Sequence, residues 1–298
     1  MKKIILQTLA VLALLAALPQ ARAWTYSDGD VLLIFRNGSK DVEFDIGGIS
    51  SFLGKTNGYS TTVTNWSFNL VTNTFGALAG AKVVLIASTG STNWLSSTEP
   101  NTTAYNLGQS DFDSQYGVIN AVGTSPLNPF AIPATPTNSL NSYVIDVGGQ
   151  YKGRSYDYVV SGGQFNGIYK LGGNAQFIVE QTAPGFLDFW QILPSSAYPN
   201  PPANTLIGTF TISSTGVLTF IAGPRAPTVT KVARSGGVST VTFSTTVGNT
   251  YSLAYTNKLG GAAGTWPVDA GTITGNGSLN SISHTNTGGV EFYRVSAQ

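Results

Sequence analysis

The segment from Ser27 to Gly48, SDGDVLLIFRNGSKDVEFDIGG, is the part of the chain richest in groups that could do chemistry. It holds five of the fourteen acidic residues: Asp28, Asp30, Asp41, Glu43 and Asp45. Carboxylates at this density can bind a cation or act as acids and bases. They are equally typical of the solvated face of a β-hairpin. The elements that carry them decide between these readings.

Two apolar runs flank the pair Asn37-Gly38, which is a strong signal for a tight hairpin turn. We predict strands over residues 31–35 and 41–46. A two-residue turn gives the register pairs Leu33–Val42 and Val31–Phe44. Because side chains alternate along a strand, the acids of the second strand then fall together on the other face.

We expect that acidic face to be mainly solvated, with Arg36 offsetting part of its charge. Asp28 and Asp30 precede the first strand and come across from Asp45. A weak calcium site with these three residues as ligands is the alternative, although calcium needs six or more oxygen ligands.

Two further carboxylates and one tryptophan are candidates for carbohydrate chemistry. Glu180 in FIVEQ and Asp188 in FLDFWQI lie on neighbouring apolar segments, and glycoside hydrolysis needs only two carboxylates. The competing interpretation is that both point outward from half-buried strands. Trp94 lies in the polar stretch STNWLSS, where we expect it to be exposed and able to stack on a sugar ring. Trp66 falls on an apolar face and is expected in the core.

Other catalytic classes have little support. The chain has one histidine, His284, and no cysteine, so thiolate sites are excluded and neither a serine triad nor a zinc cluster is indicated. We expect His284 on the surface of a strand. The stretches GGISSFLGKT and DFDSQYG miss the spacings of a phosphate-binding loop and an EF-hand. We therefore expect a protein that is not an enzyme and that needs no cofactor.

The first 23 residues have the parts of a secretory signal peptide: MKK, a short apolar run and a terminal Ala21-x-Ala23. We expect export to the cell surface or the extracellular space, with the periplasm as an alternative, and no membrane span in the mature chain. The expected mature chain, which lacks Lys2, Lys3 and Arg22, has twelve basic and fourteen acidic residues. No basic run is present, so nucleic acid is not an expected partner.

Short alternating runs separated by Gly and Asn turns predict an all-β fold. We expect a jelly-roll-like β-sandwich over residues 24–222, with TNWSFNLV as one strand, a hairpin turning at 214–216 and one short helix within 110–122. A linker over 223–229 leads to an immunoglobulin- or fibronectin-III-like module over 230–298, with Trp266 as its core aromatic.

Several segments together resemble exported bacterial surface proteins of the PEP-CTERM/exosortase-associated type. GDVLLIFR and VEFDIGG match their opening strands, and LDFWQI and LIGTFTISSTGVLTF match the end of their domain. The Pro-Glu-Pro sorting tail of that group is replaced by the module ending VEFYRVSAQ, which is similar to fibronectin-III-like domains. The resemblance implies surface localisation and transfers no catalytic residue.

The sequence thus favours an exported, non-enzymatic structural or adhesion protein of the cell surface or extracellular matrix. Its expected partners are surface polysaccharide or other surface proteins. A carbohydrate-binding protein or weak glycoside-active enzyme that uses Trp94, Glu180 or Asp188 is the alternative.

Overall fold

The computed structural model describes residues 24–97, 109–124, 141–146, 156–157, 180–194, 205–224, 226–245, 249–258, 266, 268–276, 278–286 and 289–297. The expected signal peptide and the proline-rich stretch around residues 125–136 lie outside these ranges, and the signal peptide stays a prediction. Within the described ranges, no helix has the length and apolar character that crossing a membrane requires.

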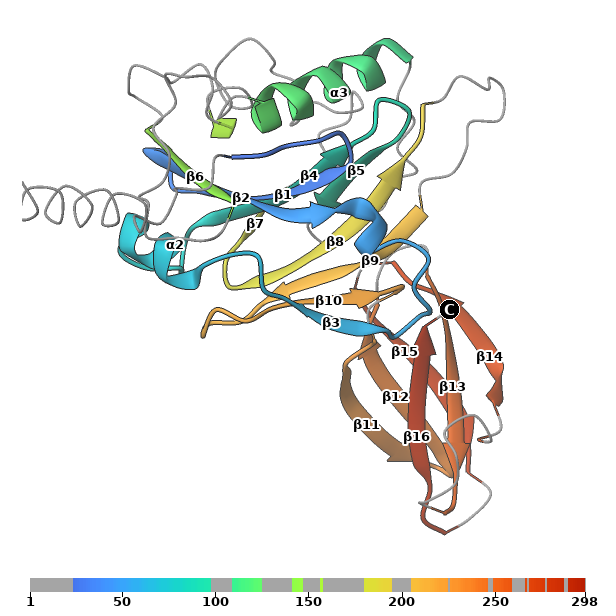
Figure 1. The fold of residues 1–298 in the computed structure, drawn as a ribbon. Helices are drawn as coiled ribbons and strands as arrows, with labels where there is room; N and C mark the ends of the chain where they lie inside the picture. Colours follow the sequence, from blue (N-terminus) through green and yellow to red (C-terminus); the bar gives the residue numbers. More distant parts are fainter. Residues whose placement is uncertain are drawn as a thin grey trace, which may run out of the picture.

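One large antiparallel sheet makes up most of the described chain (Figure 1). Its ten strands are β1 Asp30–Arg36, β2 Lys40–Gly48, β3 Ser60–Val63, β4 Lys82–Ser88, β5 Asn93–Ser97, β6 Ser142–Asp146, β7 Gln181–Thr182, β8 Gly185–Ile192, β9 Thr205–Ile212 and β10 Leu218–Ala222. They follow the order β3-β10-β9-β8-β5-β4-β1-β2-β6, with β7 paired to β4. The 3-10 turn η1 Ile49–Ser51 and the helices α2 Phe68–Phe75 and α3 Gln109–Thr124 complete this part.

The sheet curls, so that its two halves face each other around one core while α3 lies over the outer face (Figure 1). The central strands β1 and β4 are buried on both faces, because alternate residues enter two different cores. Leu33 and Leu85 belong to the inner core, and Ile34 and Val84 to the core under α3. This double burial explains why VLLIF and VVLIA are continuous apolar runs.

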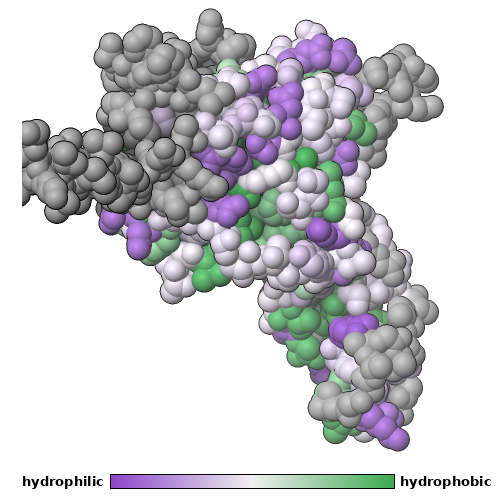
Figure 2. Space-filling view, viewed as in Figure 1, coloured by the Kyte–Doolittle hydropathy of each residue, from purple (hydrophilic) through white to green (hydrophobic). Residues whose placement is uncertain are grey.

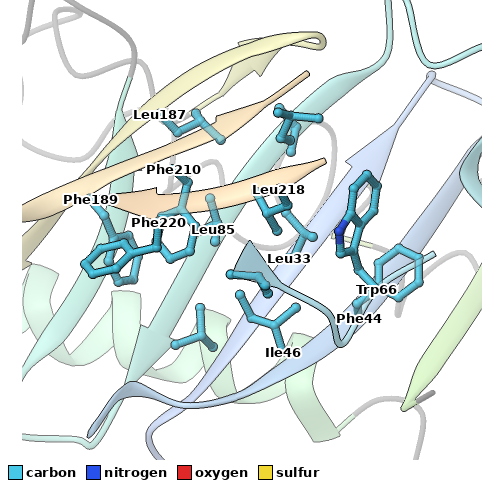
Figure 3. Packing of buried hydrophobic residues seen from close by; sticks show 14 of the residues in the cluster. Leu33, Phe44, Ile46, Trp66, Leu85, Leu187, Phe189, Phe210, Leu218 and Phe220 are labelled. Atoms are coloured by element: carbon cyan, nitrogen blue, oxygen red, sulfur yellow. The ribbon is translucent and has the colours of Figure 1, made fainter. Parts of the chain in front are cut away.

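Aromatic side chains fill the inner core (Figure 3). Phe210 of β9 lies 5.0 Å from Phe220 of β10 and 5.2 Å from Phe52, measured between ring centroids. Trp66, which precedes α2, stacks on Phe35 of β1 with ring centroids 5.6 Å apart. The same core includes residues of β1, β9 and β10, so strands from both halves of the curl share it. The prediction that Trp66 is a core residue is confirmed.

The opening hairpin has the predicted strands but not the predicted turn. Phe35 pairs with Val42 and Leu33 pairs with Phe44, so the register differs from the predicted one by two residues, and the turn is at Gly38 and Ser39, between Asn37 and Lys40. The reason is the side chain of Asn37, whose Oδ1 accepts hydrogen bonds from the backbone N–H groups of Ser39 at 3.0 Å and Lys40 at 2.9 Å. A shift of two residues keeps every side chain on its predicted face.

The segment TNWSFNLV is not a strand, and that prediction is wrong. Ser67 caps the N-terminus of α2 by accepting a hydrogen bond from the Leu70 N–H at 3.1 Å, and Gly76 ends the helix with φ = +86°. Trp66 and Phe68 alternate with polar residues over only a few positions, and these include the N-cap of the helix. Over so short a segment, the spacing of apolar residues does not distinguish a strand from a helix.

Helix α3 was predicted and is confirmed over Gln109–Thr124. Phe112, Ile119 and Val122 pack onto the outer face of the sheet. The side-chain amide of Asn93 on β5 donates to Gln115 Oε1 at 2.6 Å, which fixes the helix above that strand.

Residues after 226 form two three-stranded antiparallel sheets, β11-β12-β15 and β14-β13-β16. The strands are β11 Val229–Ser235, β12 Val238–Ser244, β13 Thr250–Thr256, β14 Val268–Thr274, β15 Leu279–Thr285 and β16 Phe292–Ala297. Phe243 and Tyr251 meet between the sheets with centroids 5.5 Å apart. Trp266 was expected in this core but is half-buried beside Arg294 and is not among the core residues.

The prediction of an all-β, sandwich-like fold with little helix is therefore confirmed. The hairpin of β9 and β10 turns at residues 213–217, where Gly216 adopts φ = +80°, as the sequence predicted. The expected linker over 223–229 follows β10, although its last residue, Val229, is already the first residue of β11.

Candidate functional site

The acids of β2 lie on the face of the sheet that α3 covers. Glu43 pairs with Ile34, a residue of the core under α3, so its side chain points toward the helix side. Asp41 and Glu43 are each 0% exposed, and the predicted solvated face is wrong for both. Alternation correctly placed the acids on one face, but it carries no information about what covers that face.

Arg36 is the centre of a buried cluster of ion pairs at the end of β1. Its Nε donates to Glu180 Oε1 at 2.7 Å and its Nη2 donates to Glu180 Oε2 at 2.8 Å, so it grips this carboxylate with two parallel bonds. Its Nη1 donates to Asp157 Oδ1 at 2.5 Å. The backbone N–H of Asp157 donates to Asp41 Oδ2 at 2.8 Å, which extends the cluster to β2.

Burial dominates the electrostatics of the two acids on β2. Loss of water raises the pKa of Asp41 to about 7, and the nearby charges of Asp157 and Glu180 add to the rise. The hydrogen bond from the Asp157 N–H and the charge of Arg36 oppose it. Burial, followed by the charge of Asp41, also raises the pKa of Glu43 well above its ordinary value.

Glu43 differs from its neighbours in having no counter-charge. The backbone N–H of Tyr156 lies near enough to lower its pKa somewhat, yet neither carboxylate oxygen accepts a hydrogen bond of good geometry from the described residues. An uncompensated buried carboxylate is neutral at neutral pH, because ionisation without a partner is too costly. Burial therefore favours the protonated form of Glu43, next to Asp41, whose pKa is raised to about 7.

Two carboxyl groups with raised pKa values are a combination that can exchange protons. Both are fully buried, however, so a polymeric substrate has no access to them in this conformation. What the cluster does in the folded chain is join β1 and β2 to residues 157 and 180, which are 121 and 144 positions from Arg36 in the sequence.

The pair Glu180 and Asp188 does not point outward, and that interpretation is wrong. Glu180 is bound to Arg36, whereas Asp188 on β8 accepts a hydrogen bond from Thr209 Oγ1 at 2.8 Å. Each carboxylate is thus engaged with a different strand. Their proposed catalytic role stays a prediction.

Trp94 is 4% exposed and belongs to the inner core, so the prediction of an exposed sugar platform is wrong. It lies on β5 between Ala87 of β4 and Gln191 of β8. The polar residues around it mislead, because Ser91 and Thr92 lie in the turn before the strand while Asn93 and Ser96 are themselves buried.

The three acids of the alternative calcium site are separately engaged. Asp28 Oδ2 accepts from the Tyr116 hydroxyl, Asp30 Oδ2 from the Ser27 N–H, and Asp45 Oδ2 from the Asn141 amide. Burial, with the charge of Asp30, raises the pKa of Asp45, so these two acids do lie near each other. Over the described ranges, no three Asp, Glu or His side chains are grouped so that they could hold a metal ion. Calcium binding stays a prediction.

His284 is buried rather than on the surface, so that expectation is wrong. It lies on the inward face of β15, where its ring centroid is 3.9 Å from that of Tyr255 and its Nε2 is 3.7 Å from Glu291 Oε2. Sequence spacing pointed to no partner because these residues come from β13 and the approach to β16.

The residues that organise the site were largely missed from the sequence. Arg36 was expected only to offset charge, and Asp157 carries no motif. Comparisons of the chain with protein-family models, with curated proteins and with solved structures found no match. The functional argument therefore depends on the geometry alone.

Proposed function

We propose that the chain is an exported, non-enzymatic structural or adhesion protein of the cell surface or extracellular matrix. One observation carries the proposal: two of the carboxylates singled out from the sequence, Glu180 and Asp41, are bound to other parts of the same chain. Glu180 and Asp157 are both paired to Arg36, and Asp41 holds the Asp157 backbone. Groups used in this way hold a framework together and leave the surface to make contacts.

The resemblance to PEP-CTERM/exosortase-associated surface proteins supports the same proposal. Its motifs correspond to β1, β2, β8, β9 and β10, all strands of the one large sheet. The resemblance thus concerns the framework of the sandwich, which suits a group defined by where its members reside. For this chain it remains a proposal.

A fibronectin-III-like character of the second part is also proposed. Support comes from its strand order, in which the first, second and fifth strands form one sheet and the third, fourth and sixth form the other. Such modules act as spacers or docking units between larger domains. In this chain the module would set the sandwich apart from the surface or offer a contact to it.

Cell fractionation of a tagged full-length chain tests the proposal. We expect the tag in the outer-surface or extracellular fraction and in the cytoplasm when residues 2–23 are deleted. A full-length chain that stays in the cytoplasm would refute export. A panel of polysaccharides assayed with the chain beginning at Trp24 tests the other half, since turnover that disappears in Glu180→Gln would establish an enzyme instead.

A further inference from the structure

The outward face of the sheet β11-β12-β15 carries hydroxyl groups that meet in pairs. Thr240 of β12 lies opposite Ser283 of β15 with the side-chain oxygens 3.0 Å apart, and Thr242 lies opposite Ser281 with the oxygens 2.8 Å apart. Val241, between the two threonines, is in the core, so both hydroxyl pairs are on the other side of the sheet. The pairs are two residues apart along each strand, which is about 7 Å.

This outward face is almost uncharged. The register of the three strands places eleven residues on it: Lys231, Ala233, Ser235, Val238, Thr240, Thr242, Ser244, Leu279, Ser281, Ser283 and Thr285. Those on β11 and β15 are exposed and those on β12 are half-buried, so the face is accessible. Lys231 is the one charged residue of the eleven, whereas a solvated protein surface is typically about a quarter to a third charged. In Figure 2, hydrophobic and pale residues predominate where β11 lies, while hydrophilic residues gather on the first sandwich.

The chemistry of this face matches that of a neutral sugar polymer. A hydrogen bond between two hydroxyl groups uses one O–H donor, so each pair still has one donor and several acceptor positions for a ligand. Apolar groups lie at the two ends of the array, because Val238 is beside Thr285 at one end and Leu279 is beside Ser244 at the other. A sugar presents the same combination, with hydroxyl groups that both donate and accept and with C–H groups on the faces of its ring.

The hydroxyl array is long and narrow. Leu279 and Thr285 are the ends of β15, and a strand of this length spans about 20 Å. Across the strands, the hydroxyl pairs occupy only β12 and β15, whose axes are about 5 Å apart. On the β11 side the same rows continue with Ala233 and Lys231, which carry no hydroxyl group. These dimensions suit one extended polymer chain better than the surface of a crystal.

We propose that the outward face of β11-β12-β15 binds a single extended chain of a neutral polysaccharide, which lies along β12 and β15. The two hydroxyl pairs exchange hydrogen bonds with sugar hydroxyls, and Val238 and Leu279 contact the C–H faces of the rings. The eleven residues of this face include no aromatic side chain, so each sugar is held weakly and binding depends on the many repeats of a polymer. The inference rests on the proposed role as a surface or matrix protein, since it names the polymer to which the second sandwich attaches.

Affinity electrophoresis of the chain beginning at Trp24 tests the proposal. The neutral probes are mixed-linkage β-glucan, hydroxyethylcellulose and dextran, and alginate is the charged probe. We expect saturable retardation by at least one neutral probe, and this retardation should persist in added salt because no ion pair is involved. The proposal would be overturned if none of the three neutral probes retarded the chain. Retardation by alginate alone, removed by salt, would overturn it as well, since binding would then depend on charge.

Two matched double variants locate the binding face. Thr240→Val with Ser283→Ala removes one hydroxyl pair with little change of shape, and Ser60→Ala with Thr62→Val removes two exposed hydroxyl groups from β3 of the first sandwich. We expect the first to weaken binding by about tenfold and the second to leave it unchanged, with both folded by circular dichroism. Ser281→Arg, which places a long side chain on the array, should abolish binding. Equal effects of the two double variants, or full binding by Ser281→Arg, would refute the site.

Ice also presents a regular array of hydroxyl groups, and thermal hysteresis measured on the same proteins tests it as the occupant. We expect the chain beginning at Trp24 to show no hysteresis. Inhibition of ice growth that is lost in Thr240→Val with Ser283→Ala would show that this face binds ice and would refute the proposed partner.

Fractionation separates this inference from the function on which it rests. A chain found at the cell surface that binds none of the neutral probes would refute only the polysaccharide-binding face. A chain that binds a neutral probe but stays in the cytoplasm would refute only the surface role.

Discussion

Replacing Glu43 by glutamine tests whether this buried acid is neutral in the folded chain. In the unfolded chain the carboxyl has its ordinary pKa of 4.5 and is ionised at neutral pH, whereas burial raises its pKa well above that value in the fold. Folding above about pH 4.5 is therefore coupled to proton uptake. Each pH unit above 4.5 costs about 1.4 kcal/mol, so the total reaches up to about 3 kcal/mol at neutral pH.

Glutamine has nearly the same shape and no proton to take up. Glu43→Gln should therefore stabilise the protein by up to about 3 kcal/mol at neutral pH, and by close to nothing near pH 4, where the unfolded chain already holds the proton. The buried amide lacks a partner as the protonated acid does, so the desolvation costs of the two side chains largely cancel.

Urea unfolding of the chain beginning at Trp24, measured at about pH 4, 5.5 and 7, gives the free energies needed. Asp113→Asn, on the exposed side of α3, is the control, and its effect should be small at each pH. The reasoning would be refuted by a glutamine variant that is less stable at neutral pH. A stability difference that does not grow between the acidic and the neutral measurement would refute it equally.

The other predictions concern single contacts. Asp41→Asn keeps an oxygen that can accept the hydrogen bond from the Asp157 N–H. Because the pKa of Asp41 is raised in the folded chain, the native protein should lose stability as the pH rises from about 4 to 7, and this variant should not. Urea unfolding midpoints measured over a pH series test this. Arg36→Leu leaves two buried carboxylates without their counter-charge and should cost about 3–5 kcal/mol by the same unfolding assay, and a loss below about 1 kcal/mol would contradict the role given to Arg36. Gly208→Ala puts a methyl group into the carbonyl oxygen of β10 that faces it and should cost about 1–3 kcal/mol, seen as a lower melting temperature.

The strands could be predicted from the sequence where the pattern of apolar residues is compatible with only one kind of element. The runs VLLIF and VVLIA must be buried whichever strands flank them. In the opening hairpin, the predicted register was wrong by two residues, and an even shift leaves each side chain on its predicted face. The helix α2 was missed because a single Ser67 cap decides between helix and strand over so short a segment.

The site could not be predicted for a different reason. A polar face of a strand indicates solvent only when nothing covers it, and residues 156–157, whose backbone N–H groups lie beside Asp41 and Glu43, are distant in the chain. Trp94 and His284 were misjudged in the same way, from their immediate neighbours. Local alternation fixes which side chains share a face, whereas the burial of that face is a property of the tertiary fold.

Glu43 is the residue whose presence the fold does least to explain. The ion pairs of Arg36 connect distant segments, whereas Glu43 has no counter-charge and its burial opposes folding at neutral pH. A stabilised Glu43→Gln variant would show that the acid is not there to hold the sandwich together. The effect would then be assigned to the ionisable carboxyl, since the ability to ionise is the property that glutamine of nearly the same size lacks.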